Sequence, residues 1–290
     1  MNEEGGMYEL GANRYGKSRI RLVTVRRDPD RHVLRDLTVD VSLEGDFTAA
    51  HVDGDNANLV ATDTMKNTVY AFARDNLDGT AESFGLTVAR HFAGYPQVDR
   101  ATITIREHGW SRVTLAAGPS PDAFRRDGDM TRVAVVAASK SGATIEAGIE
   151  DLTIMKTTKS AFVGFERDER TTLPEAEDRL MATKITALWG YGETAAEPGF
   201  DFDSAFESAR SALMTTLAEH FSPSVQASIW IMASAMLEAE PTIDWVRMVL
   251  PNLHHWTVNL EPFGLDNPAA VYVSTSEPYG LIDATVRRSS

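Results

Sequence analysis

The order of hydrophobic periodicities along the chain is the feature that most limits its fold. Residues 19–25 alternate between apolar and charged or polar side chains, and residues 32–43 are rich in Val and Thr. An Asp-Pro-Asp turn at 28–30 separates the two runs. Period-two alternation on both sides of a turn predicts a β-hairpin. Two helical patterns and then two more strand patterns follow, at 60–74, 82–92, 101–106 and 110–115.

The second half of the chain repeats this order. Its strand, helix and strand patterns lie at 132–138 and 144–156, then 202–221 and 224–238, then 246–260 and 271–286. The Gly-, Pro- and Asp-rich segment 117–129 has the composition of a linker between the halves. We therefore predict an α+β fold of two tandem β-β-α-α-β-β units, 1–128 and 129–290, with antiparallel sheets and helices on one face. A four-stranded sheet with one bare face predicts an oligomer.

Composition removes several classes of function. The 290 residues include no cysteine, which excludes disulfides, thiolate metal sites, iron–sulfur clusters and a cysteine nucleophile. Seven scattered histidines make a metal site an unfavourable hypothesis, and the net charge of −14 disfavours nucleic acid and anionic membranes as partners. The apolar stretch at 227–239 is too short to cross a bilayer. Without a signal-peptide pattern or an S-K-L tail, we expect a soluble, cytoplasmic protein.

Two glycine-rich segments imitate nucleotide-binding motifs. Residues 11–18, GANRYGKS, match the phosphate-binding loop formally, but that loop must lie between a buried strand and a helix. Strand alternation follows it here, so ATP or GTP binding is the weaker interpretation. Residues 190–195 resemble a dinucleotide fingerprint, yet Pro198 and Gly199 interrupt the helix that should follow. We interpret that segment as a loop.

Several polar positions could build an anion site, although each also has a plain structural explanation. Ser222-Pro223 predicts the start of a helix, with serine as N-cap and proline at the first helical position. The next helical amides would favour an anion, but a capped helix needs no ligand. Arg179 lies in a carboxylate-rich segment, 174–179, that we interpret as a short helix. Asn252 and His254 are two residues apart and would share one face of a strand.

Taken in order, a set of short motifs resembles the urate oxidase (uricase) family. The motifs are Tyr15-Gly16-Lys17, VATDTMKNTVY at 60–70, FVGF at 162–165, TTL at 171–173, Asp178-Arg179, Ser224-Val225-Gln226, LPN at 250–252, His254 and PYGLI at 278–282. The resemblance covers nearly the whole chain, and the stretch from about 94 to 129 is the part that does not match. The resemblance also explains the apparent phosphate loop as part of the Tyr-Gly-Lys motif. Leu253 departs from the family, which commonly has a lysine there.

The resemblance implies a fold and a reaction. Members have the tunnelling fold, in which four chains form a barrel and the active sites lie at subunit interfaces. They oxidise urate with O2 and water to 5-hydroxyisourate and H2O2, without a metal or an organic cofactor. The partners so implied are urate, O2 and three further copies of this chain.

The resemblance also implies roles for single residues. Arg179 and Gln226 would hold the planar urate anion, the Val225 amide would donate to it, and Phe162 would stack on its ring. Asn252 would hold O2 or water above that ring.

A second group of residues would move protons or complete the site. Thr62 and Asp63 would come from a neighbouring subunit. Lys17, Thr62 and His254 would form the proton relay. The catalytic residues implied are therefore Lys17, Thr62 and His254.

Two other classes of function stay open on the sequence alone. A non-catalytic purine-binding protein of the same fold would bind urate without consuming oxygen. A nucleotide-binding enzyme would depend on residues 11–18 for affinity toward ATP or GTP. Both are distinguished from an oxidase by incubating the protein with urate in air.

Overall fold

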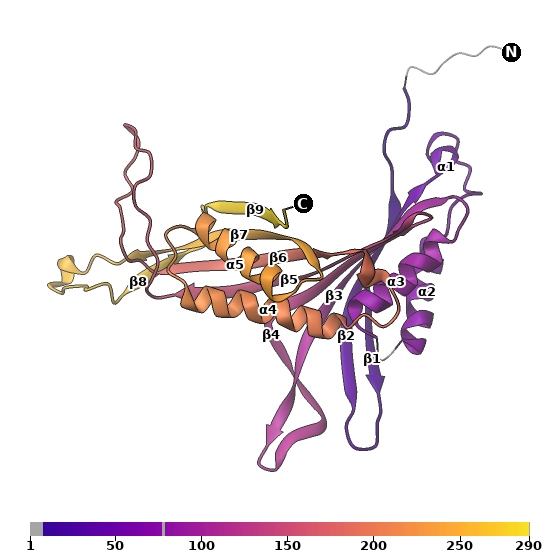
Figure 1. Ribbon diagram of the computed structural model, residues 1–290, viewed down its shortest axis with the longest axis horizontal. Helices are drawn as coiled ribbons and strands as arrows, with labels where there is room; N and C mark the ends of the chain where they lie inside the picture. Colours follow the sequence, from indigo (N-terminus) through magenta and orange to yellow (C-terminus); the bar gives the residue numbers. More distant parts are fainter. Residues whose placement is uncertain (1–7, 77–78, 290) are drawn as a thin grey trace. The chain divides into compact units, whose positions relative to one another are not determined.

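A computed structural model describes residues 8–76 and 79–289 (Figure 1). The chain divides into two compact units, which are described separately below. The first consists of the residues up to Gly128 together with Arg132–Ala147 and Gly192–Phe202. The second consists of Asp129–Thr131, Gly148–Tyr191 and Asp203–Ser290.

The first unit is a β-sheet with helices against it. Its elements are β1 (Tyr15–Arg26), β2 (Val33–Gly45), α1 (Thr48–Val52), α2 (Thr62–Asp75), α3 (Ala81–Ala93), β3 (Val98–Leu115) and β4 (Gly118–Ser139). The strands are ordered β1-β2-β3-β4, and β2 pairs antiparallel with both β1 and β3. The predicted hairpin at 19–43 and both predicted helices are therefore confirmed.

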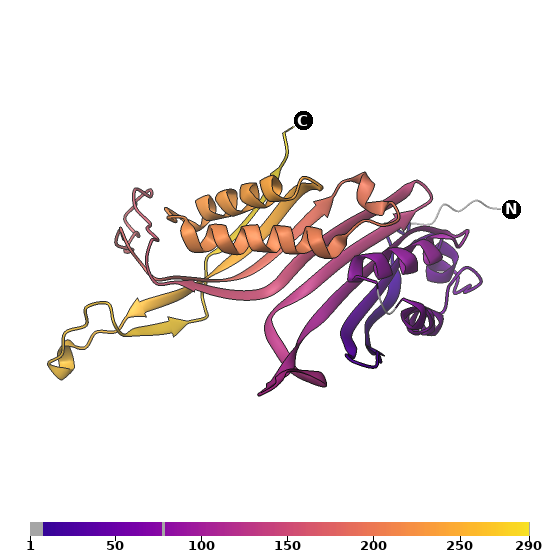
Figure 2. The same ribbon diagram turned by 60° about the horizontal axis from the view of Figure 1, so that its bottom comes forward.

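The second unit has the same kinds of element. They are β5 (Gly142–Lys156), whose first residues belong to the first unit, β6 (Met181–Tyr191), α4 (Phe202–Glu219), α5 (Val225–Ala239), β7 (Ile243–Thr257), β8 (Tyr272–Thr275) and β9 (Leu281–Arg287), with the 3-10 turn η2 (Glu261–Phe263). The 3-10 turn η1 (Glu193–Ala196) belongs to the first unit. Strand β7 pairs antiparallel with β6, β8 and β9. Helices α4 and α5 lie side by side along one face of these strands (Figure 2). The α+β class is confirmed.

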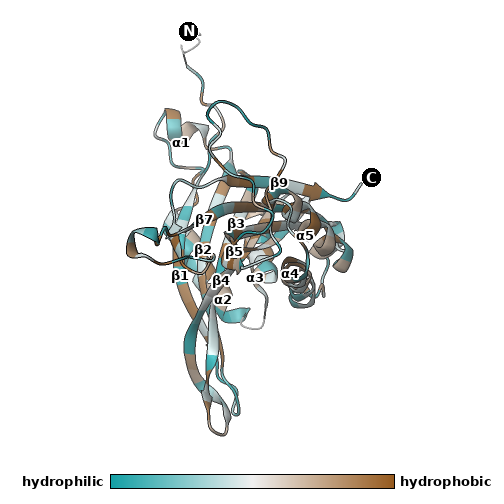
Figure 3. Cartoon of the chain, turned by 90° about the vertical axis from the view of Figure 1, so that its left-hand side faces the viewer, coloured by the Kyte–Doolittle hydropathy of each residue, from teal (hydrophilic) through white to brown (hydrophobic). Residues whose placement is uncertain are grey.

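Each sheet buries one set of alternate residues beneath its helices. In the first unit Val39, Val41 and Leu43 are at most 1 % exposed, as the period-two pattern requires. Hydrophobic and hydrophilic residues alternate in colour along the strands in Figure 3. Gly85 brings α3 close to the sheet, because a Cβ there would lie 2.9 Å from Val136 Cγ2. Burying each such large apolar side chain contributes about 1.5–3 kcal/mol.

Three sequence-based expectations about secondary structure were wrong. Segment 117–129 is not a linker, because Gly118 begins β4 and a hairpin arm continues through the Gly- and Pro-rich residues. Arg112 secures this arm by donating to the carbonyl oxygens of Ser120 and Pro121, at 3.0 and 2.7 Å. The two strand patterns between 101 and 115 are one strand, β3. The third concerns the element order of the second half: the strands at 132–138 and 144–156 are confirmed within β4 and β5, but a further strand, β6, lies between β5 and α4.

Two smaller expectations also fail. Residues 174–179 contain no helix and instead form a bridge in which Ala176 pairs with Phe162. Ser224, not Ser222, caps α5, and Pro223 precedes the helix. The interpretation of residues 11–18 is confirmed, since β1 and not a helix follows Tyr15. Within the described residues, none of the helices is both long and apolar enough to span a bilayer.

Candidate active site

A hollow of about 440 Å³ in the second unit collects the second-half residues predicted to bind a ligand. It is lined by the segment before β6, the first turn of α5 and the far part of β7. The predicted residues in its lining are Phe162, Arg179, Val225, Gln226, Asn252 and His254. Four segments far apart in sequence therefore deliver their polar groups to one concave surface, as small-molecule sites usually require.

Arg179 is the most distinctive group in the hollow. Its guanidinium carbon lies 5.2 Å from the centre of the Phe162 ring. Its Nε is buried and has no hydrogen-bond partner among the described residues. Burial lowers the pKa of Arg179 from its ordinary value. A desolvated cation with an unused donor is poised for a charge-assisted hydrogen bond to an anion.

Backbone hydrogen bonds rather than a helix hold Arg179 beside Phe162. The Arg179 N–H donates to Ser160 O at 2.7 Å, and the Phe162 N–H donates to Ala176 O at 2.7 Å. Asp178 accepts from the Thr158 hydroxyl at 2.7 Å, and this hydrogen bond lowers the pKa of the Asp178 carboxyl. The carboxylates near Arg179 therefore brace the loop instead of neutralising the guanidinium.

The N-terminus of α5 points its first amides toward the same hollow. Ser224 is extended at φ −165° and accepts a hydrogen bond from the Ala227 N–H at 3.1 Å. Val225 is buried, whereas the Gln226 side chain is exposed. The amides at the start of a helix lack intrahelical acceptors, and the helix dipole favours negative charge there. This end of α5 can therefore hold an anionic edge of a ligand.

Asn252 and His254 share one face of β7, as their spacing predicts. The Asn252 backbone N–H donates to Gly280 O at 2.8 Å. The His254 ring stacks on Trp256, with centroids 5.4 Å apart and planes 21° apart. Trp256, two residues beyond His254, was not identified from the sequence, although period-two spacing would have found it. The lining also includes Leu173 and His255, which the sequence analysis did not assign to a site.

Lys17, Thr62 and Asp63 belong to the first unit, where Tyr15 joins their segments. The Tyr15 hydroxyl donates to Val60 O at 3.1 Å and accepts from the Val60 N–H at 2.7 Å. The β1 strand that carries Lys17 is thereby tied to the residues immediately before α2, which begins at Thr62. Tyr15, which the sequence analysis had used only as part of a motif, therefore joins the segment that carries Lys17 to the one that carries Thr62.

Gly16 and a β-bulge set the path of the chain around Lys17. A Cβ at position 16 would lie 1.8 Å from Val41 O, so only glycine allows the strands to approach this closely. The pairing of β1 with β2 shifts between Lys17 and Ile20, and Arg19 in the bulge has φ 58°. Bulges of this kind redirect side chains at functional sites.

Asp63, at the start of α2, is exposed and paired. Its carboxylate accepts hydrogen bonds from Lys66 and from Asn67 Nδ2, the latter at 2.9 Å. The Lys66 hydrogen bond is the main reason that the pKa of Asp63 is lowered, and the charge of Lys17 contributes in the same direction. Lys17 and Asp63 are therefore near enough to interact electrostatically.

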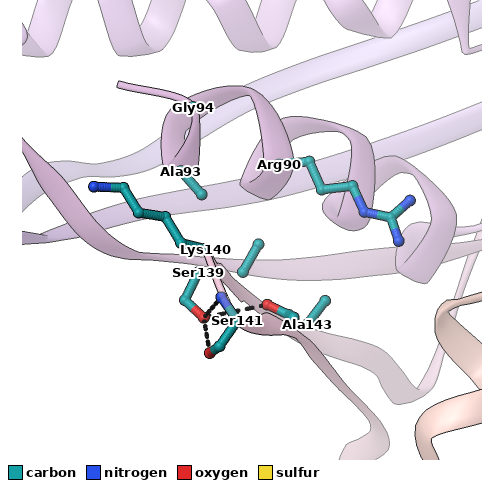
Figure 4. A pocket seen from close by; sticks show the side chains of 9 residues that line it. Arg90, Ala93, Gly94, Ser139, Lys140, Ser141 and Ala143 are labelled. Atoms are coloured by element: carbon teal, nitrogen blue, oxygen red, sulfur yellow. Dashed lines mark hydrogen bonds between the residues drawn. The ribbon is translucent and has the colours of Figure 1, made fainter. Parts of the chain in front are cut away.

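A second hollow of about 360 Å³ in the first unit does not gather free cations. The end of α3 and the β4–β5 turn line it (Figure 4). Arg90 donates to Ala196 O at 3.0 Å, and Lys140 donates to Pro96 O at 3.2 Å. Figure 4 shows these two side chains extending in opposite directions. In the ranges 8–76 and 79–289, no three His, Asp or Glu side chains gather as a metal-binding group.

The structure is that of an α+β protein whose 440 Å³ hollow brings together a half-buried arginine, an aromatic ring and the N-terminus of a helix. Comparison with known proteins gives the family. The sequence profile of the uricase family matches residues 13–137 and 145–283. The chain belongs to the uricase family and is therefore an oxidoreductase.

Individual relatives agree over almost the full length. The chain is 45 % identical to the uricase of Arthrobacter globiformis over 280 residues, covering 96 % of this chain and 90 % of that protein. It is 36 % identical to the uricase of Aspergillus flavus over 298 residues, covering 98 % of each. The crystal structure of the Arthrobacter globiformis uricase superposes with a TM-score of 0.91 at 44 % identity, covering 98 % of this chain and 96 % of that chain.

The profile match also corrects one expectation. The stretch from about 94 to 129, which carries no recognisable motif, lies inside the matched region. The unmatched interior residues are 138–144 instead. These form the β4–β5 turn beside the smaller hollow.

Proposed function

We propose that this protein oxidises urate with O2 and water to 5-hydroxyisourate and H2O2, using neither a metal nor an organic cofactor. Membership in the uricase family supports the substrate and the reaction class. The observation that carries the proposal is the half-buried Arg179 guanidinium, whose Nε has no hydrogen-bond partner among the described residues, in a hollow shared with Phe162, Gln226, Asn252 and His254. These are the groups that a planar, anionic purine would need.

The second-unit residues would bind and orient the substrate. Arg179 and the Gln226 amide offer adjacent donors that match neighbouring acceptors on the edge of a purine. The Val225 N–H adds a donor at the helix terminus, and Phe162 supplies an aromatic face for stacking. Asn252 would hold O2 or water over the ring.

The proton relay would use Lys17, Thr62 and His254. A lysine, a hydroxyl and an imidazole in contact can take a proton from urate and later deprotonate the attacking water. Because urate itself supplies the electrons to O2, the protein needs only to bind, orient and move protons. Thr62 and Asp63 would enter the site from a neighbouring subunit.

We further propose the tunnelling fold and a homotetrameric barrel. The element orders β1-β2-α2-α3-β3-β4 and β5-β6-α4-α5-β7-β9 support two tandem units, which follow one another between β4 and β5; the division expected at 128–129 falls inside β4. The β7–β8 arm exposes large apolar side chains that a neighbouring copy would cover. They are Trp256, Phe263, Leu265, Val271 and Val273.

The deciding experiment is an aerobic assay on metal-stripped protein. Urate absorbance should fall while H2O2 accumulates, and absence of turnover at high protein concentration would overturn the proposal. A urate-binding protein without catalysis would bind urate while consuming no oxygen.

A variant pair then tests the relay. Lys17→Met should lower kcat by about 100-fold or more, the scale of general acid–base catalysis, with a much smaller change in KM. Lys184→Met is the matched control, because Lys184 is a surface lysine paired with Asp151. Equal losses in kcat and KM for Lys17→Met would contradict a proton-transfer role.

A further inference from the structure

A chain of polar side chains, buried except for the half-buried His220, lies next to the segments that carry the residues of the hollow. It runs from Lys156 at the end of β5, through His220 after α4, to Ser228 in α5 and Ser222 before α5. Ser222 and Ser228 are fully buried, and none of the four residues lines the hollow. We call these four residues the buried polar chain. Buried polar groups are costly unless they are all hydrogen-bonded, so such a chain calls for an explanation.

Lys156 closes the C-terminal end of α4. Its Nζ donates to Leu217 O at 3.0 Å and also to His220 O. The last carbonyl groups of a helix lack intrahelical donors, and a cation is favoured at that end. Burial lowers the pKa of Lys156. Lys156 therefore fixes the backbone that presents His220.

The hydrogen bonds of His220 define its tautomer. Nδ1 lies 2.6 Å from Thr216 O, and a carbonyl can only accept, so Nδ1 carries a proton. Nε2 lies 2.9 Å from Ser228 Oγ. Burial, reinforced by the charge of Lys156, lowers the pKa of His220 and so favours the neutral ring. In the neutral ring Nε2 accepts from the Ser228 hydroxyl, which couples the end of α4 to the first turns of α5.

Ser222 extends this coupling to the segments that carry Phe162 and Arg179. Its Oγ lies 2.7 Å from Ser228 Oγ. Its backbone N–H donates to Lys159 O at 2.9 Å, and its carbonyl accepts from the Ala161 N–H at 2.7 Å. Ala161 immediately precedes Phe162 in the sequence.

Two further contacts complete the connection. The neighbouring Ser160 carbonyl accepts from the Arg179 N–H at 2.7 Å. The Ser228 backbone N–H donates to Ser224 O at 3.1 Å, next to Val225 and Gln226. The α5 terminus, the Phe162 segment and the Arg179 segment are thus all braced against Ser222 and Ser228.

We propose that His220 is a positioning residue for urate binding, acting through Ser228 and Ser222 to hold Arg179, Phe162 and the α5 amides in register. The proposal rests on the proposed function for the identity of the ligand. His220 touches neither the hollow nor the relay residues, so its loss should weaken binding and leave proton transfer largely intact.

Two substitutions at position 220 separate positioning from simple packing. His220→Asn keeps a donor near Thr216 O but is too short to reach Ser228, whereas His220→Gln is long enough to reach it. The Asn variant should raise the KM for urate about tenfold, the scale for losing one buried hydrogen bond, with kcat within about twofold. The Gln variant should recover most of the lost affinity. His51→Asn, an exposed histidine in α1, is the control.

Anaerobic urate titration makes the test independent of turnover. Without O2 the Kd of the wild-type protein for urate can be measured directly. Ser228→Ala should raise this Kd as much as His220→Asn does, and the double variant should have a Kd no higher than that of either single variant. Ser228→Ala also serves if a position-220 variant fails to fold. An unchanged Kd in Ser228→Ala or in a folded His220→Asn variant overturns the proposal. An equal loss of urate affinity in His220→Gln and His220→Asn also overturns it. If wild-type protein fails to bind urate anaerobically, the proposed function fails instead.

Discussion

Replacing Arg179 by methionine should stabilise the empty protein while weakening its hold on urate. The buried Nε has no hydrogen-bond partner among the described residues, so no hydrogen bond offsets the desolvation cost of this donor. Methionine is unbranched, has a similar length and can keep contact with the Phe162 ring. The two effects of one substitution therefore have opposite signs.

The magnitudes follow from the contacts of Arg179. Removing an unsatisfied buried polar group recovers about 1–3 kcal/mol. Losing the cation–π contact over Phe162, with its 5.2 Å separation, costs about 0.5–1 kcal/mol. The net gain of about 1–2 kcal/mol raises the Tm of the empty protein by about 2–4 °C for a chain of this size. Binding loses about 2–5 kcal/mol, which raises KM about 30-fold or more.

Thermal melts with and without urate, under anaerobic conditions, measure both effects on one sample. A bound ligand raises Tm in proportion to RT ln(1 + [L]/Kd), so urate should raise the wild-type Tm and leave that of Arg179→Met almost unchanged. Steady-state assays in air supply KM. Arg170→Met is the control in the same segment, because the Arg170 side chain is 80 % exposed and pairs with its exposed neighbour Glu169.

One outcome would refute the reasoning about Arg179. If the variant melted several degrees lower without ligand while keeping its KM, Arg179 would be a structural group and the ligand clamp would be wrong. A raised KM together with an unchanged or higher Tm would support the role.

Three further predictions concern stability. Gly16→Ala should lower the free energy of unfolding by about 2–4 kcal/mol, on the scale of severe overpacking, because its Cβ would lie 1.8 Å from Val41 O. Thermal melts measure this loss, with Gly11→Ala as the control because a Cβ at position 11 meets nothing within 4 Å. Glu82→Gln should cost about 3 kcal/mol in denaturant titrations, since it leaves a mostly buried arginine without its charged partner. The pKa of His220 in the folded protein is lowered from 6.5, so below about that pH the unfolded chain binds more protons than the folded one. The free energy of unfolding should therefore decrease as the pH is lowered through this range. His220→Gln should make this pH dependence less steep, as measured by denaturant titrations at several pH values.

The parts of the fold and site that the sequence predicted are those encoded by local pattern. Strand alternation in β1 and β2 and helical spacing in α2, α3 and α5 indicated the correct elements. Asn252 and His254 share a strand face because their spacing is two. The family resemblance carried by ordered motifs identified four further residues: Phe162, Arg179, Val225 and Gln226. In the structure these residues line one hollow together with Asn252 and His254.

The failures arise where non-local pairing overrides local composition. Gly, Pro and Asp in segment 118–128 indicate a loop, but the ladder with β3 and the donors of Arg112 keep that segment extended. The carboxylates at 174–179 favour a helix locally, yet the bridge between Ala176 and Phe162 and the bond from Thr158 to Asp178 decide its course. The tertiary partners of these residues are 8 to 20 positions away or more, beyond any local window.

The net charge of −14 conflicts with an anionic substrate only if the whole charge acts at the site. Screening limits the reach of surface charges to about 8–10 Å at physiological ionic strength. Inside that range the hollow presents the half-buried Arg179 and the positive end of α5, while Asp178 has its carboxylate engaged by Thr158 and Ser160. Because interactions with partly buried groups are screened much less than those with surface charges, the local field decides binding. The acidic surface therefore governs the behaviour of the protein in solution, and the electrostatics of the site are set by a few desolvated donors.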